Sequence, residues 1–122
     1  MKRVLIADDQ RTIRMLVAAT LAVARLDVLE ASDGTEAWGL IREHRPDLAI
    51  LDVQRPGQTG LELVRAIRQD EKLADTRIIL LTATAQGSDV EAGLSVGADR
   101  YVTKPFSPLD LLEEVRQVLE LE

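Results

Sequence analysis

The sequence has no cysteine and no long hydrophobic run. Without thiols, neither a disulfide framework nor a thiolate metal site can form, and a reducing compartment suits the chain. The longest uncharged apolar stretch, Met15 to Ala24, is about half the length that spans a bilayer. The apolar run that starts at Val4 stops at Asp8, too early for a secretion signal. We therefore expect a cytoplasmic protein with no membrane segment.

Aromatic residues and clustered basic residues are also scarce. Trp38, Tyr101 and Phe106 are the only aromatics, and single basic residues are scattered among acidic ones in a chain of net charge −6. Nucleic-acid interfaces need clustered cations, and those for single strands often use stacked aromatics. We expect no direct nucleic-acid binding.

The 122 residues have the size of one compact domain, and nothing among them resembles a linker. Short apolar runs alternate with segments of helical period, a pattern that predicts about five strands. The runs are Val4 to Ala7, Val28-Leu29, Leu48 to Leu51, Ile78 to Leu81 and Tyr101-Val102. Near-continuous apolar strands separated by helices are typical of a parallel sheet covered on both faces. The prediction is an α/β fold with the strand-helix unit repeated five times, as a single domain over residues 1–122 with no output domain.

Apolar residues recur on one face of each predicted helix. The recurring positions are Ile13, Leu16, Val17 and Leu21, then Leu61, Val64 and Ile67, then Leu111, Leu112, Val115, Val118 and Leu119. Asp33-Gly34 precedes one helix and Arg45-Pro46-Asp47 ends it, while Ser107-Pro108 has the pattern of an N-cap followed by a first-turn proline. The segment from Gly87 to Gly97 has the weakest helical pattern.

Polar residues stand where the predicted strands end. Asp8 and Asp9 follow the first strand, Asp52 the third, Thr82 the fourth, and the fifth leads into Lys104-Pro105. Open parallel sheets bind ligands at the carboxyl ends of their strands, so we expect these side chains to meet at one edge of the sheet.

Three carboxylates at one edge repel each other unless a cation lies among them. Mg²⁺ fits such a site because it prefers oxygen ligands, uses one or two carboxylates and keeps waters that a phosphate can replace. We expect Asp9 and Asp52 to bind Mg²⁺ directly and Asp8 to hold a metal-bound water. The backbone carbonyl of Gln54 is a further hypothetical ligand.

A carboxylate can also act as a nucleophile toward a phosphoryl group, which then needs positioning and charge neutralisation. Asp52 is the candidate acceptor. Lys104 offers a point charge for phosphate, and the Thr82 hydroxyl can donate a hydrogen bond to it.

Each of these residues taken alone has a simpler interpretation. Asp8 or Asp9 could cap the helix that begins near Gln10, Asp52 could be a turn residue, Thr82 a strand end and Lys104 a solvated charge. Their joint placement is what favours a site. His44 and Trp38 are interpreted as a surface residue at a helix end and a packing residue.

Taken together, the motifs resemble the receiver domains of response regulators in two-component signalling. The resemblance covers essentially the whole chain and rests on Val4-Leu5-Ile6-Ala7-Asp8-Asp9, Pro46-Asp47-Leu48-Ala49-Ile50-Leu51-Asp52, Pro56, Gly60-Leu61-Glu62, Leu81-Thr82-Ala83, Gly97-Ala98-Asp99 and Tyr101-Val102-Thr103-Lys104-Pro105-Phe106. It implies the strand order 2-1-3-4-5. It also implies a sensor histidine kinase or phosphotransfer protein as donor, Mg²⁺ as cofactor, and a downstream protein or covalently linked effector domain as target.

By the same resemblance, Asp52 matches the phosphoacceptor, Asp8 and Asp9 the acidic pair, and Lys104 the lysine of the site. Thr82 matches the switch hydroxyl and Tyr101 the switch aromatic, and the Lys104-Pro105 bond is expected to be cis. The family implies a signalling phosphoacceptor that assists its own phosphoryl transfer and hydrolysis, rather than an enzyme acting on other substrates.

The chain departs from the family pattern near the acceptor. Arg55 stands where a methionine is usual, and Thr59 where an aspartate is common before Gly60. Gln54 and Thr84 occupy positions that tune the approach of hydrolytic water in similar proteins. The phosphate lifetime, the cognate kinase and dimerisation on phosphorylation are left open.

Three rival functions have different sequence requirements. A pseudo-receiver would be a phosphate-independent interaction module on the same fold, which the intact acidic residues disfavour. A phosphatase of the haloacid dehalogenase kind would need an Asp-x-Asp pattern after the first strand, where Asp8 and Asp9 are adjacent. A flavodoxin-like flavin carrier would need a hydroxyl-rich loop at that place.

Overall fold

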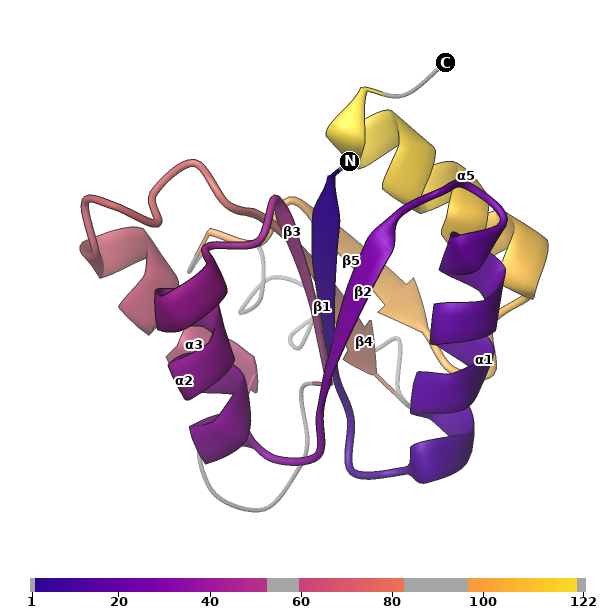
Figure 1. Ribbon diagram of the computed structural model, residues 1–122, viewed down its shortest axis with the longest axis horizontal. Coiled ribbons are helices and arrows are strands. Elements are labelled where there is room, and N and C mark those ends of the chain that lie inside the picture. The colour runs from indigo at the N-terminus through magenta and orange to yellow at the C-terminus, as the bar shows by residue number, and fades with distance from the viewer. Residues whose placement is uncertain (1, 53–59, 83–96, 121–122) are drawn as a thin grey trace.

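A computed structural model describes residues 2–52, 60–82 and 97–120 of the chain (Figure 1). These residues form a parallel five-stranded sheet in the order β2-β1-β3-β4-β5, with four helices among the described segments. The elements in chain order are β1 (Arg3–Ala7), α1 (Arg11–Ala22), β2 (Asp27–Ala31), α2 (Gly34–His44), β3 (Leu48–Asp52), α3 (Gly60–Gln69), β4 (Arg77–Thr82), β5 (Arg100–Thr103) and α5 (Pro108–Leu119). The predicted fold class and strand order are confirmed.

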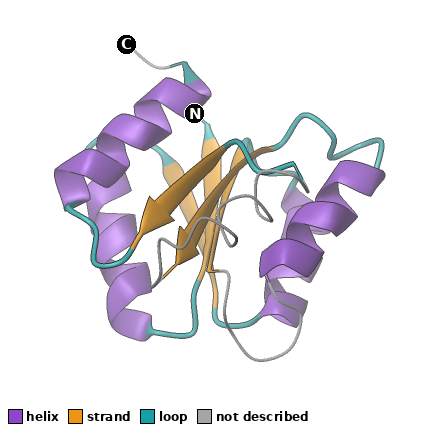
Figure 2. Ribbon diagram, turned by 180° about the vertical axis from the view of Figure 1, so that it is seen from behind, coloured by secondary structure: helices purple, strands orange, loops and turns teal. Residues whose placement is uncertain are grey.

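Helices cover both faces of the sheet. Figures 1 and 2 show α1 and α5 on one side of the strands and α2 and α3 on the other. Successive residues of β1 alternate between the two layers: Val4 and Ile6 pack in the core under α1 and α5, whereas Leu5 and Ala7 pack under α2 and α3. Because both faces are buried, the central strands are apolar at nearly every position, which is why they read as continuous runs.

The five predicted strands are confirmed, and each extends at least one residue beyond its apolar run. The predicted helix from Gly87 to Gly97 lies outside the described residues apart from Gly97 itself. Among the helices that the structure describes, none is long and apolar enough to cross a membrane.

One prediction for α1 was wrong. Val17 and Leu21 are fully buried, but Leu16 is 39% exposed instead of facing the core with them. Consecutive helical residues are about 100° apart around the axis, so Leu16 lies at the margin of the stripe that Val17 and Leu21 define.

Side chains and backbone conformation set the ends of the helices. The Asp33 carboxylate accepts a hydrogen bond from the Glu36 N–H at 2.7 Å and caps α2. Ser107 occupies the N-cap position of α5 as predicted, with Pro108 in the first turn, but the Ser107 side chain makes no capping hydrogen bond.

α2 ends at His44, and the C-cap residue Arg45 adopts a left-handed conformation with φ 47° and ψ 63°. A side chain with a Cβ pays about 1 kcal/mol or more for this conformation, and glycine does not. We therefore expect Arg45→Gly to raise the free energy of unfolding by about 0.5–1 kcal/mol in urea denaturation. Arg45→Ala is the matched control, because it removes the same side chain and keeps the Cβ. Equal stability of the two variants would contradict the prediction.

At the far end of the sheet from the predicted site, Arg68 of α3 fixes the segment that leads into β5. Its guanidinium donates to the carbonyls of Gly97 (2.9 Å) and Thr76 (2.6 Å) and to Asp99 Oδ2 (3.0 Å). Asp99 Oδ2 also accepts from the Ile78 N–H at 2.8 Å. These bonds hold the start of β5 against β4, and the other end of β5 leads into Lys104.

Candidate functional site

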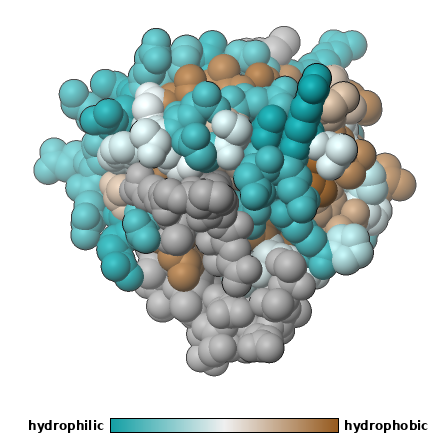
Figure 3. Space-filling model, turned by 90° about the horizontal axis from the view of Figure 1, so that it is seen from below, coloured by the Kyte–Doolittle hydropathy of each residue, from teal (hydrophilic) through white to brown (hydrophobic). Residues whose placement is uncertain are grey.

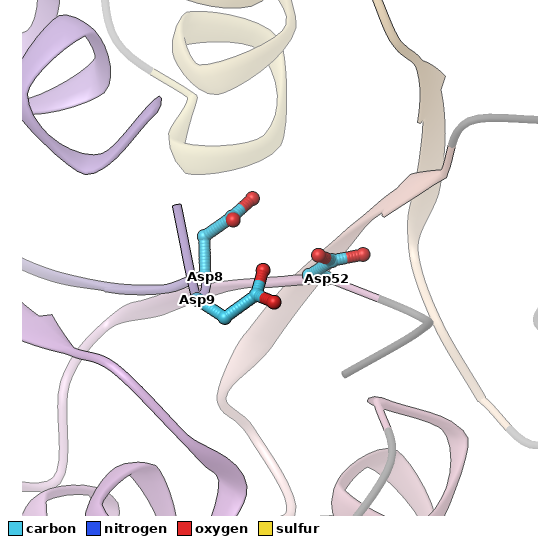
Figure 4. A group of neighbouring side chains, drawn as sticks. All are labelled: Asp8, Asp9 and Asp52. Atoms are coloured by element: carbon cyan, nitrogen blue, oxygen red, sulfur yellow. The ribbon is translucent and has the colours of Figure 1, made fainter. Parts of the chain in front are cut away.

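The polar residues at the strand ends meet at the carboxyl edge of the sheet (Figure 4). One carboxylate oxygen from each of Asp8, Asp9 and Asp52 lies within 4.8 Å of the other two. Lys104 Nζ is 2.7 Å from Asp8 Oδ2 and 3.3 Å from Asp52 Oδ2. Figure 3 looks onto this end of the molecule, where hydrophilic side chains fill much of the described surface.

The strand register brings these residues together. Ala7 pairs with Leu51 across β1 and β3, so the next residue along each strand is Asp8 on one side and Asp52 on the other. Thr82 pairs with Thr103 across β4 and β5, and Lys104 follows at once. Parallel strands end at a common edge, so neighbouring strands deliver their next residues to the same place.

Asp8 is fully buried and both of its carboxylate oxygens are engaged. Oδ1 accepts from the Gln10 N–H at 2.9 Å and Oδ2 accepts from Lys104 Nζ at 2.7 Å. Gln10 is itself the N-cap residue of α1, so neither Asp8 nor Asp9 caps that helix. Asp9 is exposed, and its carboxylate has no hydrogen bond or ion pair within the described segments.

Lys104 carries the positive charge of the site. Burial would lower the pKa of Lys104, but the hydrogen bond to Asp8 and the negative charges of Asp52 and Asp8 outweigh that cost and raise the pKa above its ordinary value. The lysine therefore stays charged at every physiological pH.

The donor set fits a hard divalent cation. All three acidic side chains offer oxygen, and three carboxylates beside one ammonium leave two negative charges at a site where Asp8 and Asp52 are buried and Asp9 is exposed. One Mg²⁺ ion would neutralise these two negative charges, and Mg²⁺ binds carboxylate oxygens while it retains water ligands.

Thr82 is the last residue of β4, and Tyr101 lies on the neighbouring strand β5, in register with Leu80. Thr82 is 2% exposed, and its carbonyl accepts a hydrogen bond from the Lys104 N–H at 2.6 Å. Tyr101 is half-buried, and its hydroxyl is buried without a hydrogen-bond partner among the residues the structure describes. The Lys104-Pro105 peptide bond is cis. Gln54, Arg55 and Thr84 lie outside the described residues.

Sequence reasoning missed Arg14, which reaches the site from the second turn of α1. Its Nη1 donates to the backbone carbonyl of Asp8 at 2.6 Å, and its Nε lies 3.5 Å from Glu30 Oε1. A signal was present: α1 has no acidic residue in its first turn but carries Arg11 and Arg14 near its positive end, where cations are unfavourable. Such cations need acidic or carbonyl neighbours from elsewhere in the fold.

Comparison with known proteins places this arrangement in a family. The family described as the response regulator receiver domain matches residues 4–116. The chain belongs to this family. Receiver domains are the phosphoacceptor domains of two-component signalling, so they are signalling proteins rather than enzymes in the usual sense.

Several curated relatives of this receiver domain are longer proteins. The chain is 42% identical over 118 residues to the phosphate regulon transcriptional regulatory protein PhoB of Pseudomonas aeruginosa. It is 40% identical over 119 residues to the DNA-binding dual master transcriptional regulator RpaA of a Synechocystis species. The alignments cover 97% and 98% of this chain but 52% and 49% of those proteins, so the receiver domain spans about half their length.

Solved structures match the receiver domain over nearly its whole length. The chemotaxis response regulator CheY4 of Vibrio cholerae is 37% identical with a TM-score of 0.92, covering 97% of this chain and 98% of that one. The BeF3-activated receiver domain of DrrB is 33% identical with a TM-score of 0.89, covering 98% of each chain. The receiver fold is therefore shared with solved response regulator structures over nearly the whole chain.

Proposed function

We propose that Asp52 accepts a phosphoryl group from a phosphohistidine of a sensor histidine kinase or phosphotransfer protein, in a reaction that needs Mg²⁺. The observation that carries the proposal is the position of Asp52. Asp52 is 6% exposed, and its carboxylate belongs to a cluster with two further carboxylates and lies 3.3 Å from the ammonium of Lys104.

Asp9 and Asp52 would hold the Mg²⁺ directly, and Asp8 through a water. In support, both Asp8 oxygens already accept hydrogen bonds, whereas the exposed Asp9 carboxylate has no partner among the described residues. The proposed carbonyl ligand from Gln54 falls in a segment that is not described. When bound, Mg²⁺ would supply positive charge to the oxygens of the incoming phosphoryl group.

The transfer itself is a displacement at phosphorus. A carboxylate oxygen of Asp52 forms the new P–O bond while the P–N bond to the donor histidine breaks, and the electron pair of that bond stays on the imidazole nitrogen. Lys104, freed from part of its contact with Asp52, donates to a phosphoryl oxygen and balances the added negative charge.

The product adds charge that residues beside it can sense. The Thr82 hydroxyl would donate to the phosphoryl group, and Tyr101 on the next strand would follow into the space that Thr82 leaves. The Tyr101 hydroxyl is buried and has no hydrogen-bond partner among the described residues, which supports a ring that exchanges environments rather than one held by a fixed bond. Gln54, Arg55 and Thr84 would tune the phosphate lifetime.

The proposal for the whole chain is a cytoplasmic receiver domain over residues 1–122 that controls a downstream protein or a covalently linked effector domain. The scattered basic residues and net charge of −6 support control through protein contacts instead of direct binding of this domain to nucleic acid.

The test is phosphoryl incorporation from acetyl phosphate, followed by intact mass spectrometry. We expect one phosphoryl group per chain with Mg²⁺ present and none after EDTA treatment, because the site without a divalent cation keeps two uncompensated negative charges. Adding Mg²⁺ back should restore incorporation. A chain that takes no phosphoryl group from acetyl phosphate or from phosphorylated histidine kinases would instead be a phosphate-independent interaction module.

A further inference from the structure

Of the three acidic side chains of the site, that of Asp9 has the fewest contacts within the described residues. Asp8 is held through both carboxylate oxygens, and Asp52 lies within a strand and contacts Lys104. The Asp9 side chain is exposed and makes no hydrogen bond or ion pair within the described residues, yet its carboxylate turns toward those of Asp8 and Asp52 (Figure 4). Its orientation must therefore be set by the backbone that carries it.

The backbone in question is the peptide group between Asp8 and Asp9. The carbonyl oxygen of Asp8 belongs to this group, and Arg14 Nη1 donates to it at 2.6 Å. A peptide group is planar, so fixing its carbonyl also fixes the N–Cα bond from which Asp9 projects. On the other side of Asp8, its N–H donates to the Ala31 carbonyl at 3.1 Å.

Arg14 is itself held in place. Its side chain is 15% exposed, and its Nε faces Glu30 Oε1 at 3.5 Å. Glu30 lies in β2, the strand that pairs with β1 directly before the acidic residues. The guanidinium thus joins α1, the end of β1 and β2, and its planar fork can hold the carbonyl and the carboxylate in one geometry.

We propose that Arg14 is a positioning residue that holds the Asp8-Asp9 peptide, and through it the Asp9 carboxylate, in the orientation needed to bind a divalent cation. This inference rests on the proposed function, because it concerns the same metal site. Residues that orient metal ligands through hydrogen bonds commonly change metal affinity by about 10- to 100-fold when removed.

Electrostatics alone predicts the opposite sign. Arg14 is a cation near an acidic site, so removing its charge should strengthen the attraction for Mg²⁺. Weaker Mg²⁺ binding after its removal would therefore report positioning and not charge.

The experiment is a calorimetric titration of the whole chain with MgCl₂, comparing wild type with Arg14→Met and Arg11→Met. Arg11 is the matched control because it is an exposed arginine in the first turn of the same helix, and its side chain makes no hydrogen bond or ion pair within the described residues. We expect Arg14→Met to raise the Mg²⁺ Kd at least about tenfold. Arg11→Met should leave the Kd unchanged or slightly lower. Circular dichroism establishes that each variant is folded at the titration temperature.

Phosphoryl incorporation gives an independent readout. In Arg14→Met the Mg²⁺ concentration for half-maximal rate should rise as the Kd does, while the rate at saturating Mg²⁺ stays near wild type. Should Arg14→Met not fold, Arg14→Lys carries the same test, since its ammonium keeps the charge but cannot reproduce the planar fork.

The outcomes separate the two proposals. Wild type that binds Mg²⁺ together with an Arg14→Met Kd equal to or below that of wild type would overturn the positioning role and leave the proposed function intact. A wild-type chain that binds no Mg²⁺ would overturn the proposed metal-dependent function, and the role of Arg14 with it.

Discussion

Asp52→Asn is expected to abolish phosphoryl incorporation from acetyl phosphate, even at saturating Mg²⁺. The amide has no anionic oxygen to form the P–O bond, and no neighbouring carboxylate offers an equal substitute. Asp8 is buried with both oxygens in hydrogen bonds, and Asp9 is exposed and lacks the 3.3 Å contact with Lys104 that Asp52 has. Intact mass spectrometry of wild type and variant under identical donor and Mg²⁺ concentrations measures the loss.

The matched control for this experiment is Asp110→Asn, an exposed aspartate in the first turn of α5. It removes the same charge from the same chain and should incorporate phosphate as wild type does. A thermal melt should show Asp52→Asn to be folded, because the amide has nearly the same shape and relieves repulsion from the other two carboxylates. Undiminished incorporation in Asp52→Asn would show that the acceptor is another residue.

The meeting of Asp8, Asp52 and Lys104 could be predicted from the sequence for a physical reason, whereas the strand order followed from the resemblance to receiver domains. Strands buried on both faces are apolar throughout, so each run ends where the chain leaves the sheet, and the first polar residue marks that edge. Parallel strands end at a common edge, so the sequence alone assigns Asp8, Asp52 and Lys104 to one place.

The apolar periodicity of the sequence predicts burial less reliably for residues at the margin of a helix's buried face. The apolar repeat that correctly places Val17 and Leu21 in the core also includes Leu16, but Leu16 is 39% exposed in the structure. Apolar residues on a helix report the direction of the buried stripe, but its width depends on the curvature of the sheet beneath and on neighbours such as α5.

Arg14 and Arg68 could not be found by residue type alone. Each uses its guanidinium mainly on backbone carbonyls, and every residue carries one, so no partner residue type stands out in the sequence. Arg68 near the end of α3 reads as a favourable surface charge at a helix terminus. Only the position of Gly97 and Asp99 beside it shows that it fixes the entry to β5.

Lys104→Met is expected to lower the free energy of unfolding by about 3 kcal/mol in EDTA, because it leaves buried carboxylates without their cation. Lys104 lies 2.7 Å from the fully buried Asp8 carboxylate and 3.3 Å from that of Asp52. The loss should shrink in saturating Mg²⁺, since a divalent cation bound only to the folded state both neutralises the site and stabilises the fold. The variant should also bind Mg²⁺ more tightly than wild type, since one competing positive charge is gone.

Urea denaturation in EDTA and in saturating Mg²⁺ measures the loss of stability and how far Mg²⁺ reduces that loss. Lys72→Met is the matched control. Lys72 is an exposed lysine whose ammonium has no hydrogen bond or ion pair within the described residues, so its removal should leave the free energy of unfolding within about 0.5 kcal/mol of wild type. Equal stability of Lys104→Met and wild type in EDTA would contradict a role for Lys104 in balancing the site.

The pH dependence follows from the raised pKa of Lys104. A group whose folded-state pKa lies above its unfolded value contributes stability that is complete below the unfolded pKa and is lost as the pH rises through the folded one. The ordinary value is 10.5, so the stability difference between wild type and Lys104→Met should be constant from about pH 7 to 9. It should decline only above the ordinary value, as the ammonium of the folded protein loses its proton. A difference that already fell between pH 7 and 9 would show that the carboxylates do not hold the lysine charged.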